Sequence, residues 1–470
     1  MSEQADHDLI VIGAGPAGMA AAVAAARHDL DVVLLDEQPA PGGQVFRNVE
    51  AVVAKSPSRA ALLGRDYGYG AAFVDALRQS SVDYRPETGV WQIAEDGTVG
   101  TLSTAGAALI SGRRVVIATG AMERPVPIPG WTLPGVMTAG AAQTLLKTSN
   151  LVPDGRVVLV GSGPLFFLVA RQLLAADADI VGVLDTTSDE NYQAAQKVML
   201  GALKFWRDLL KGRRWMREIT KSGVPFHHEV QDVRILGQDR ASGVSFEAKG
   251  VEYRLEADMV LLHEGVVPDQ HLARSLDCRE RWDEEQLCWH IDCDDWGATS
   301  LERIAVAGDC GSIGGAAAAS HRGRLAGLDA AMRLGAIDEA TRDRLGQRDL
   351  KADARLAGLR LFLDRLYRPR SEVLVPPDDA VVVCRCEEVT AGALRQAAAL
   401  GVAGPNQAKA FTRAGMGPCQ GRNCGLTVAA ILADAEGKTA ADMGQFRVRP
   451  PIKPITVDQL ADLAVAEPSD

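Results

Sequence analysis

Four cysteines near the C-terminal end of the chain stand in two close pairs. They are Cys384-Arg-Cys386 and Cys419-Gln-Gly-Arg-Asn-Cys424, with 32 residues between the pairs. Four thiolates grouped in this way suit a [2Fe-2S] cluster, which transfers single electrons. We expect one helix capped by Thr390 after the first pair and another after Cys424. Structural zinc is the alternative, although these spacings differ from the C-x2-C pairs of zinc ribbons.

A glycine-rich turn near the N-terminus has the spacing of a dinucleotide-binding site. Gly13-Ala-Gly15-Pro-Ala-Gly18 follows a short apolar run, and Asp36 ends the next apolar run, 23 residues after Gly13. The first glycine permits a tight turn, the second lets the backbone approach a pyrophosphate, and the third lets the following helix pack on the strand. Asp36 or the adjacent Glu37 can accept hydrogen bonds from a ribose. An ordinary glycine turn is the alternative, but the strand context and the spacing favour a dinucleotide.

Two further segments favour FAD over NAD as that dinucleotide. Gly42-Gly-Gln44 follows the second strand, and Ala307-Gly-Asp309 stands at the end of a late strand. Each segment alone would fit a surface loop, but together they can converge on one extended ligand. Asp309 would then bind the ribityl or pyrophosphate region, and the helix start at Gly311–Gly315 would add backbone donors.

A second glycine turn departs from this pattern at its third glycine. Gly161 and Gly163 are kept, but Phe166 stands where the last glycine belongs, and its ring would displace the helix or fill the cofactor side. Asp185, 24 residues after Gly161, could still hold an adenosine ribose. NAD, another adenine nucleotide and a domain that has lost its nucleotide all remain open.

The remaining cysteines, histidines and basic residues form no catalytic set. No C-x4-C pair follows Gly42-Gly43, which disfavours a disulfide reductase, and Cys310 is expected to be a buried free thiol. His263 and His321 are expected to be structural. The basic segment Lys204–Arg217 could hold a nucleotide phosphate, although a solvated or interfacial helix face is favoured.

The elements needed to position these residues form two Rossmann-like units. Strand, turn, helix and strand follow one another from residue 9 to residue 36 and again from 156 to 185, and a late strand precedes Asp309. We expect an α/β protein resembling glutathione reductase, with the first domain interrupted by the second, and a small α-helical [2Fe-2S] domain. The predicted bounds are 1–145 and 295–367 for the FAD-binding domain, 146–294 for the NAD-type domain, 380–450 for the [2Fe-2S] domain and 451–470 for a C-terminal tail.

Composition excludes several classes of protein. A chain of 470 residues with 47% hydrophobic residues, 24% charged residues and a mean hydropathy of -0.01 is neither disordered, fibrous nor a polytopic membrane protein. A net charge of -11 argues against nucleic acid as a partner. The uncharged run Leu9–Ala26 contains glycines and a proline, so no transmembrane segment is expected, and without an export signal the chain is expected to be cytoplasmic.

Six segments of the chain together carry a resemblance to a known family. They begin Ile10-Val-Ile-Gly-Ala-Gly-Pro, Asp36-Glu-Gln-Pro-Ala-Pro-Gly-Gly-Gln, Ala118-Thr-Gly-Ala-Met-Glu-Arg-Pro, Gly130-Trp-Thr-Leu-Pro-Gly-Val, Gly161-Ser-Gly-Pro and Gly415-Met-Gly-Pro-Cys-Gln-Gly-Arg. Together they closely resemble the flavoprotein alpha subunits of heteromeric amine and amino-acid dehydrogenases. That family includes opine oxidases, hydrogen cyanide synthase and dye-linked proline or hydroxyproline dehydrogenases, with sarcosine oxidase alpha as a relative. The cysteine region resembles bacterioferritin-associated ferredoxin.

The resemblance implies an electron-handling subunit of a larger complex. In that family the substrate is usually oxidised on the flavin of a partner beta subunit, sometimes with FMN at the subunit interface and a small third subunit, and electrons pass to an acceptor such as a quinone. Attachment to the inner face of the membrane would then come through partners. The residues predicted to bind FAD or a second nucleotide are Gly13, Gly15, Pro16, Ala17, Gly18, Asp36, Glu37, Gly42, Gly43, Gln44, Ala118, Thr119, Gly120, Gly308, Asp309, Gly161, Gly163 and Asp185, and the predicted cluster ligands are Cys384, Cys386, Cys419 and Cys424.

Two other functions remain open at this point. One is a self-sufficient NAD(P)H-dependent reductase using its own FAD and cluster, which NADH would reduce without any other chain. The other is a non-catalytic assembly subunit that holds nucleotides only for structure, which would be redox-silent in an otherwise active complex.

Overall fold

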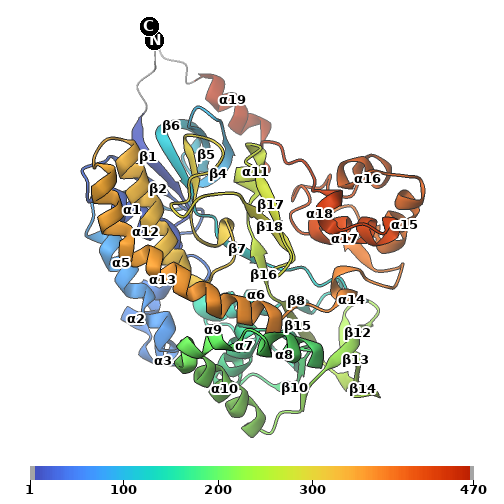
Figure 1. The fold of residues 1–470 in the computed structure, drawn as a ribbon. Helices are drawn as coiled ribbons and strands as arrows, with labels where there is room; N and C mark the ends of the chain where they lie inside the picture. Colours follow the sequence, from blue (N-terminus) through green and yellow to red (C-terminus); the bar gives the residue numbers. More distant parts are fainter. Residues whose placement is uncertain (1–5, 466–470) are drawn as a thin grey trace. The chain divides into compact units, whose positions relative to one another are not determined.

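The computed structural model describes residues 6–465, which form two compact units (Figure 1). Unit 1 falls within Met1–Met122, Val267–Ala357 and Arg447–Asp470, and unit 2 within Glu123–Val266 and Gly358–Phe446. The α/β class and a Rossmann-like sheet are confirmed, as is a helical C-terminal region.

The contact boundaries fall elsewhere than the predicted 145/146 and 294/295. Residues 123–145 belong to unit 2 because strand β8 (Val136–Thr138) pairs in parallel with β15 (Met259–Glu264). Residues 267–294 belong to unit 1 because Leu272 and Ile291 lie in its hydrophobic core.

The sheet of unit 1 is built from buried runs of valine, leucine and isoleucine. Its order is β3-β2-β1-β6-β5-β4, and β19 pairs with β6. One end of the long strand β6 lies between β1 and β19 in parallel, while its other end pairs antiparallel with β5. The strands are β1 (His7–Ile12), β2 (Val32–Leu35), β3 (Asp83–Arg85), β4 (Gly89–Ile93), β5 (Thr98–Ser103), β6 (Gly106–Ile117) and β19 (Ile304–Val306).

Two small-residue helices of unit 1 pack with their backbones close together. Helix α1 (Pro16–Ala26) meets α12 (Ala316–Arg333), and a Cβ at Gly323 would lie 2.0 Å from the Ala17 carbonyl oxygen. A Cβ at Gly327 would lie 2.3 Å from the Ala21 carbonyl oxygen, so the contact requires glycine. Between β2 and β3 the chain forms four further helices: α2 (Val49–Lys55), α3 (Pro57–Leu63), α4 (Arg65–Gly68) and α5 (Gly70–Arg78).

Later parts of the chain complete unit 1. The segment expected as a tail packs on this unit, because the Ile452 N–H donates to the Trp91 carbonyl and the Ile452 side chain is buried in the unit 1 core. Residues 466–470 of that predicted tail lie outside the described residues. The remaining elements are β7 (Ala121–Glu123), β16 (Val266–Pro268), α11 (His271–Ser275), β17 (Glu280–Asp283), β18 (Cys288–Ile291), the short 3-10 turn at Gly308–Cys310, α13 (Glu339–Leu366) and α19 (Val457–Val465).

Unit 2 contains a parallel sheet of order β11-β10-β9-β15-β8. Its central strand β9 (Val157–Ser162) leads through the second glycine turn into helix α7 (Pro164–Ala175), and β10 (Ile180–Asp185) follows. The other elements are α6 (Ala139–Ser149), α8 (Asp189–Gln196), α9 (Met199–Ala202), a 3-10 turn at Leu203–Phe205, α10 (Trp206–Lys221), β11 (Phe226–His227) and the antiparallel strands β12 (Val230–Gly237), β13 (Ala241–Ala248) and β14 (Val251–Glu256).

The cysteine-containing part of unit 2 is a small, mainly helical body with its own apolar core, here called the cysteine module. Thr390 caps its first long helix by accepting a hydrogen bond from the Ala393 N–H, and Cys424 is the N-cap of its last long helix. The elements of the module are β20 (Val382–Cys384), β21 (Val389–Thr390), α15 (Ala391–Ala399), α16 (Pro405–Thr412), α17 (Gly425–Glu436) and α18 (Ala440–Met443), and α14 (Ser371–Leu374) lies in the segment that leads to it. Among residues 6–465, no helix has the length and apolar character needed to cross a membrane.

Candidate cofactor-binding sites

The first glycine turn joins β1 to α1, and its three glycines have different environments. Gly13 has a φ of +102°, and a Cβ at Gly18 would lie 1.8 Å from the Gly13 carbonyl oxygen, so the fold requires both glycines. Gly15, the N-cap of α1, has an ordinary φ of −76°, and a Cβ there would lie 3.8 Å from the nearest atom, the Gly43 Cα. The protein's own packing therefore does not require glycine at position 15.

Asp36 and Glu37, both candidates for the ribose, differ sharply in position. The Asp36 carboxylate is buried and accepts hydrogen bonds from the Ala14 N–H at 2.5 Å and the Gln38 N–H at 2.7 Å. Burial raises the pKa of Asp36, although these two N–H groups oppose the rise. Glu37 instead forms an ion pair with Lys453 at the surface. Asp36 is therefore the acid that lies beside the glycine turn.

Three segments far apart in the sequence meet at the carboxyl ends of β1, β6 and β19. The Gly42 N–H donates to the Ala14 carbonyl at 2.8 Å, and a Cβ on Gly43 would lie 2.8 Å from the Gly15 Cα. Gln44 of the same segment is exposed. The Ala118 N–H donates to the Ile12 carbonyl at 2.8 Å, which holds the start of the Ala118–Gly120 segment against the first turn.

The late strand β19 brings Asp309 to the start of α12. One Asp309 oxygen accepts hydrogen bonds from the Gly314 and Gly315 N–H groups, at 2.8 and 2.9 Å. A Cβ at Gly308 would lie 2.7 Å from the Ala17 Cβ, so this segment packs on the first turn of α1. The predicted FAD residues of unit 1 are thus gathered around one edge of its sheet, where ligands bind in open α/β sheets.

The second glycine turn in unit 2 holds Phe166 in the layer between helix and sheet. Its ring is fully buried in an apolar cluster and lies edge-on to Phe167, with ring centroids 5.2 Å apart. The ring therefore fills the protein core and does not fill the cofactor side. A Cβ at Gly161 would lie 1.8 Å from the His263 carbonyl oxygen, and Gly163 has a φ of +103°, so both glycines serve the turn itself.

The chain's own groups engage Asp185. Its carboxylate is buried, and one oxygen accepts hydrogen bonds from the Thr187 N–H at 3.0 Å and the Thr187 hydroxyl at 2.6 Å. The other oxygen, Oδ2, lies 3.4 Å from His228 Nδ1 but has no hydrogen-bond partner within the described residues. Asp185 is therefore at the position of a ribose-binding acid and has one buried oxygen without a donor.

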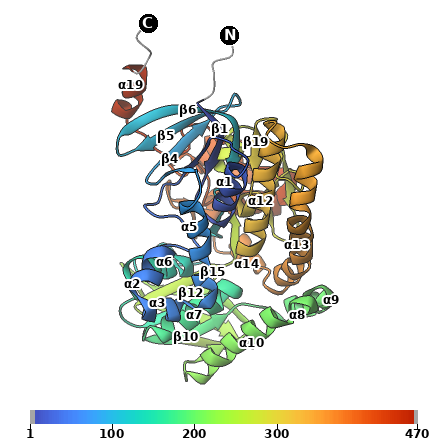
Figure 2. The same cartoon turned by 90° about the vertical axis from the view of Figure 1, so that its left-hand side faces the viewer.

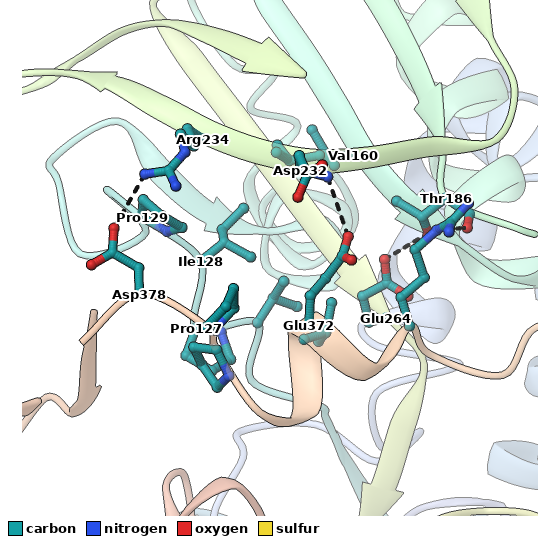
Figure 3. A pocket seen from close by; sticks show the side chains of 16 residues that line it. Pro127, Ile128, Pro129, Val160, Thr186, Asp232, Arg234, Glu264, Glu372 and Asp378 are labelled. Atoms are coloured by element: carbon teal, nitrogen blue, oxygen red, sulfur yellow. Dashed lines mark hydrogen bonds and ion pairs between the residues drawn. The ribbon is translucent and has the colours of Figure 1, made fainter. Parts of the chain in front are cut away.

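A pocket lies at the carboxyl ends of β9, β10 and β15 (Figure 3). Glu264, at the end of β15, is 3% exposed and accepts hydrogen bonds from the Thr186 hydroxyl at 2.7 Å and the Ser162 hydroxyl at 3.3 Å. Burial raises the pKa of Glu264 to about 7 despite these donors. The other walls are largely apolar and include the proline-rich segment 126–129.

The segment that leads to the cysteine module forms one side of this pocket. Arg370 Nε donates to the Thr186 carbonyl at 2.8 Å, and Glu372 accepts from the Asp232 N–H at 3.3 Å (Figure 3). Arg234 and Asp378 form an ion pair at 3.1 Å. These contacts hold the segment against β12 and against the loop that follows β10.

Glu264, Arg370 and the buried pair His263–Glu123 were not predicted as site residues from the sequence. His263 Nδ1 lies 2.7 Å from a Glu123 oxygen, so this histidine has a structural partner. Burial would raise the pKa of Glu123, but hydrogen bonds from His263, Thr138 and the Gly140 N–H, with the histidine charge, lower it overall. The signal that could have found Glu264 is an acidic residue at the end of a strand that begins with the apolar run Met259–Leu262.

The four cysteines of the module lie in two contacting pairs. The Cys386 and Cys419 sulfurs are 3.7 Å apart, and Cys384 interacts with Cys424. A hydrogen bond from Cys424 and N–H groups of residues 386, 387 and 415 lower the pKa of Cys384 to about 5, which favours its thiolate. Within the described ranges, no three metal-ligating side chains converge as they would around a single metal ion.

The glycines near the cysteines allow close packing. A Cβ at Gly417 would lie 2.2 Å from the Cys386 Cβ, and Gly421 has a φ of +80° with the Phe446 ring against it.

Cys310, outside the module, is buried with its sulfur 3.0 Å from the Ile117 carbonyl oxygen, and burial raises its pKa to about 11. It is a satisfied thiol.

Comparisons with known proteins agree with this architecture. Residues 7–333 match the pyridine nucleotide-disulphide oxidoreductase family, and residues 381–463 match the sarcosine oxidase A3 domain. The chain is 43% identical over 458 residues to an opine oxidase subunit of Rhizobium meliloti (strain 1021), covering 97% of this chain and 98% of the relative. It is 30% identical over 476 residues to hydrogen cyanide synthase subunit HcnB of Pseudomonas aeruginosa, covering 97% and 98%.

A solved structure shares the fold. L-proline dehydrogenase from P. horikoshii matches with a TM-score of 0.70 at 19% identity, covering 97% of this chain and 79% of that one. The chain therefore belongs to the pyridine nucleotide-disulphide oxidoreductase family and, within it, to the flavin-dependent subunits of heteromeric dehydrogenases and oxidases that include this opine oxidase subunit.

Proposed function

We propose that this chain is the FAD- and [2Fe-2S]-containing electron-transfer subunit of a heteromeric dehydrogenase or oxidase. The substrate would be a secondary amine or amino acid of the opine or imino-acid type, a CH-NH donor. The observation that carries the proposal is the similarity to the Rhizobium meliloti opine oxidase subunit along almost the whole of both chains. The substrate would be oxidised mainly on a partner flavoprotein subunit, with a quinone or a dye as the electron acceptor.

FAD fits the edge of the unit 1 sheet. Gly15 would admit the pyrophosphate, the buried Asp36 would hold the ribose, and Asp309 would face the ribityl or pyrophosphate region. FAD bound there would supply the exchange between two-electron and one-electron transfer. The residues of this chain would orient it, since the start of α1 and the Asp309 loop are both fixed by backbone hydrogen bonds.

A [2Fe-2S] cluster fits the cysteine module by the chemistry of its donors. Two separate cysteine pairs, 384 with 424 and 386 with 419, match a binuclear cluster in which four thiolates serve two irons. The N–H groups directed at Cys384 favour a thiolate ligand. The match to a sarcosine oxidase domain covers this module but leaves the metal to be tested.

The partners in this proposal are a beta subunit with the substrate site, a small third subunit, and FMN at a subunit interface. The relatives similar along almost the whole chain are named as subunits, which supports a substrate site that involves another chain.

NAD(P)H oxidation by this chain alone is the less favoured function. Phe166 replaces the third glycine of the NAD pattern, and relatives similar along almost the whole chain are named as subunits of larger enzymes. Within the described residues, the buried Asp185 Oδ2 has no hydrogen-bond partner, so the second domain keeps an acid that could hold an adenosine ribose. An adenine nucleotide in unit 2 is therefore compatible with the proposed function.

The test is purification from the native host, followed by identification of all subunits and assay of flavins, extracted nucleotides, iron and sulfide. The proposal predicts a second flavoprotein subunit, FAD, and iron and sulfide in equal amounts. A chain that purifies alone, and whose flavin is bleached rapidly by NADH, would identify the reductase instead.

A further inference from the structure

Exposed apolar side chains line one side of the helical segment that precedes and begins α10. Leu200, Leu203, Trp206 and Leu210 recur every three or four residues, and they are 83%, 51%, 55% and 53% exposed. This spacing places them on one face of consecutive helical turns. Isolated exposed apolar residues are common on proteins, but four in a row on one face mark an interaction surface.

Basic side chains continue the same exposed face toward the end of α10. Arg213, Arg214, Arg217 and Lys221 are exposed. Residues 203–221 carry seven basic and two acidic side chains, in a chain whose net charge is -11. Over the residues that the structure covers, no carboxylate is paired with Arg213, Arg217 or Lys221. We call the four apolar residues and these four basic residues the basic amphipathic face.

The opposite side of α10 anchors the helix to unit 2. Ile219 is fully buried in the core cluster that contains Phe166 and Phe167, and Met216 packs against the same cluster. Arg171 of α7 lies over the Trp215 ring, 5.9 Å from its centroid. Figures 1 and 2 show α10 at the outer edge of unit 2. The basic amphipathic face is therefore held outward by a packed helix.

We propose that the basic amphipathic face binds the surface of an anionic lipid membrane. Apolar side chains with a tryptophan would enter the boundary between headgroups and acyl chains, and the arginines would bind lipid phosphates. Charge complementarity selects this occupant, because seven basic residues gathered on one segment of a strongly acidic chain attract an anionic surface. A protein partner would need a matching acidic groove, and it is an outcome of the test below.

This surface gives the chain a membrane contact of its own. The sequence interpretation expected attachment to the membrane only through partner subunits. A lipid-bound quinone is an acceptor that such a contact would bring close, but vesicle binding requires no electron transfer. The result is therefore independent of the proposed redox function.

The experiment is co-sedimentation of the protein, purified from its native host with its accompanying subunits, with sucrose-loaded vesicles. The vesicles contain either phosphatidylcholine alone or phosphatidylcholine with phosphatidylglycerol. Two double variants are compared with the native protein: Trp206→Ser with Leu210→Ser, and Arg213→Glu with Arg217→Glu. The matched controls are Leu400→Ser, an apolar residue 70% exposed on the cysteine module, and Lys55→Glu, an exposed cation of unit 1.

We expect the native protein and both controls to bind the anionic vesicles, with binding reduced by added salt. Each double variant should lower the partition coefficient at least about tenfold while subunit composition and dye-linked activity in solution stay unchanged. Equal binding of the native protein and both double variants would overturn the proposal, as would no binding by the native protein. Loss of a subunit from either variant would also overturn it, because the face would then be a protein interface.

Discussion

Among the three glycines of the first turn, Gly15 is the one that the fold itself does not require. Its neighbours Gly13 and Gly18 are fixed by backbone contacts, whereas a methyl group at position 15 would meet only the Gly43 Cα, at 3.8 Å. A larger side chain would project into the region where the pyrophosphate is expected.

Gly15→Val should yield folded protein with less than about a tenth of the native flavin content. The flavin-to-protein absorbance ratio measures this, and circular dichroism checks the fold. Gly68→Ala, where a Cβ meets nothing within 4 Å, is the control and should keep its flavin. Full flavin occupancy in the valine variant would exclude the first turn as the FAD site.

Glu264 is a residue whose burial has a calculable consequence for stability. Its pKa is about 7 in the folded protein against 4.5 for an unperturbed glutamate, so the folded state holds the proton more tightly. This contribution to stability is complete below pH 4.5 and is lost as the pH rises through about 7. Each pKa unit is worth about 1.4 kcal/mol, so the loss amounts to about 3 kcal/mol.

Glu264→Gln cannot ionise and should therefore lose less stability than the native protein between pH 5 and pH 8. Urea unfolding at the two pH values measures the difference, with the exposed Glu252→Gln as a control that should follow the native protein. Identical pH dependence in the native protein and the Glu264 variant would show that this carboxylate is ionised in the folded state.

The cysteine pairs predict a modular loss of one cofactor. Cys419→Ser or Cys424→Ser should remove the visible absorbance and electron paramagnetic resonance signal of the cluster while FAD remains. The two cofactor sites are built from separate segments, and the cysteine module has its own apolar core. Cys293→Ser, a change at an exposed thiol, should leave both signals unchanged. Zinc in place of iron in anaerobically prepared native protein would contradict the cluster assignment.

At the scale of elements, local patterns predicted the parts that carry their own signals. The run Leu9–Ile12 and the run Val32–Leu35 lie within β1 and β2, and the small-residue stretch after Gly311 leads into α12. These elements are recognisable because they are apolar on all sides or follow glycine turns. Most of the acid and glycine positions around the first turn could be named for the same reason.

Elements and boundaries that depend on distant contacts could not be read in this way. The 28-residue helix α13 has charged residues throughout and no clear apolar stripe, so its helical period is weak. Phe166 lies between helix α7 and the parallel sheet of unit 2, and residues 123–145 belong to that unit through the pairing of β8 with β15. Both positions follow from packing that is formed only in the folded chain. Glu264 and Arg370, far apart in the sequence, line the same pocket for the same reason.

The contact between α1 and α12 predicts a destabilising substitution at this scale. A Cβ at Gly327 would lie 2.3 Å from the Ala21 carbonyl oxygen, which is backbone and cannot rotate away. Gly327→Val should lower the free energy of unfolding by about 1–3 kcal/mol, as overpacked cores do. Gly212→Ala on α10, where a Cβ has nothing within 4 Å, should cause no loss. An unchanged unfolding midpoint in the valine variant would contradict the close packing of these helices.

At the scale of the whole molecule, two units divide the candidate sites. Unit 1 holds the predicted FAD residues, whereas unit 2 holds the second glycine turn, the pocket beside Glu264 and the cysteine module. The chain passes between the units several times, so neither unit is a continuous stretch of sequence. Similarity to the opine oxidase subunit of Rhizobium meliloti extends over both units, so the family relationship covers the whole chain.

The proposed function places substrate oxidation on a partner subunit and electron transfer on this chain, and an assay of the chain with and without that partner tests this. The purified chain is first reconstituted with FAD, iron and sulfide. Reduction of a dye is then assayed with a panel of opines, proline and other secondary amines as substrates. The same assay is repeated in the presence of the second flavoprotein subunit. We expect the chain alone to bind FAD and the cluster without substrate-dependent dye reduction, and we expect activity once the partner is present. Substrate-dependent dye reduction by the chain alone, with no second polypeptide detectable, would contradict it.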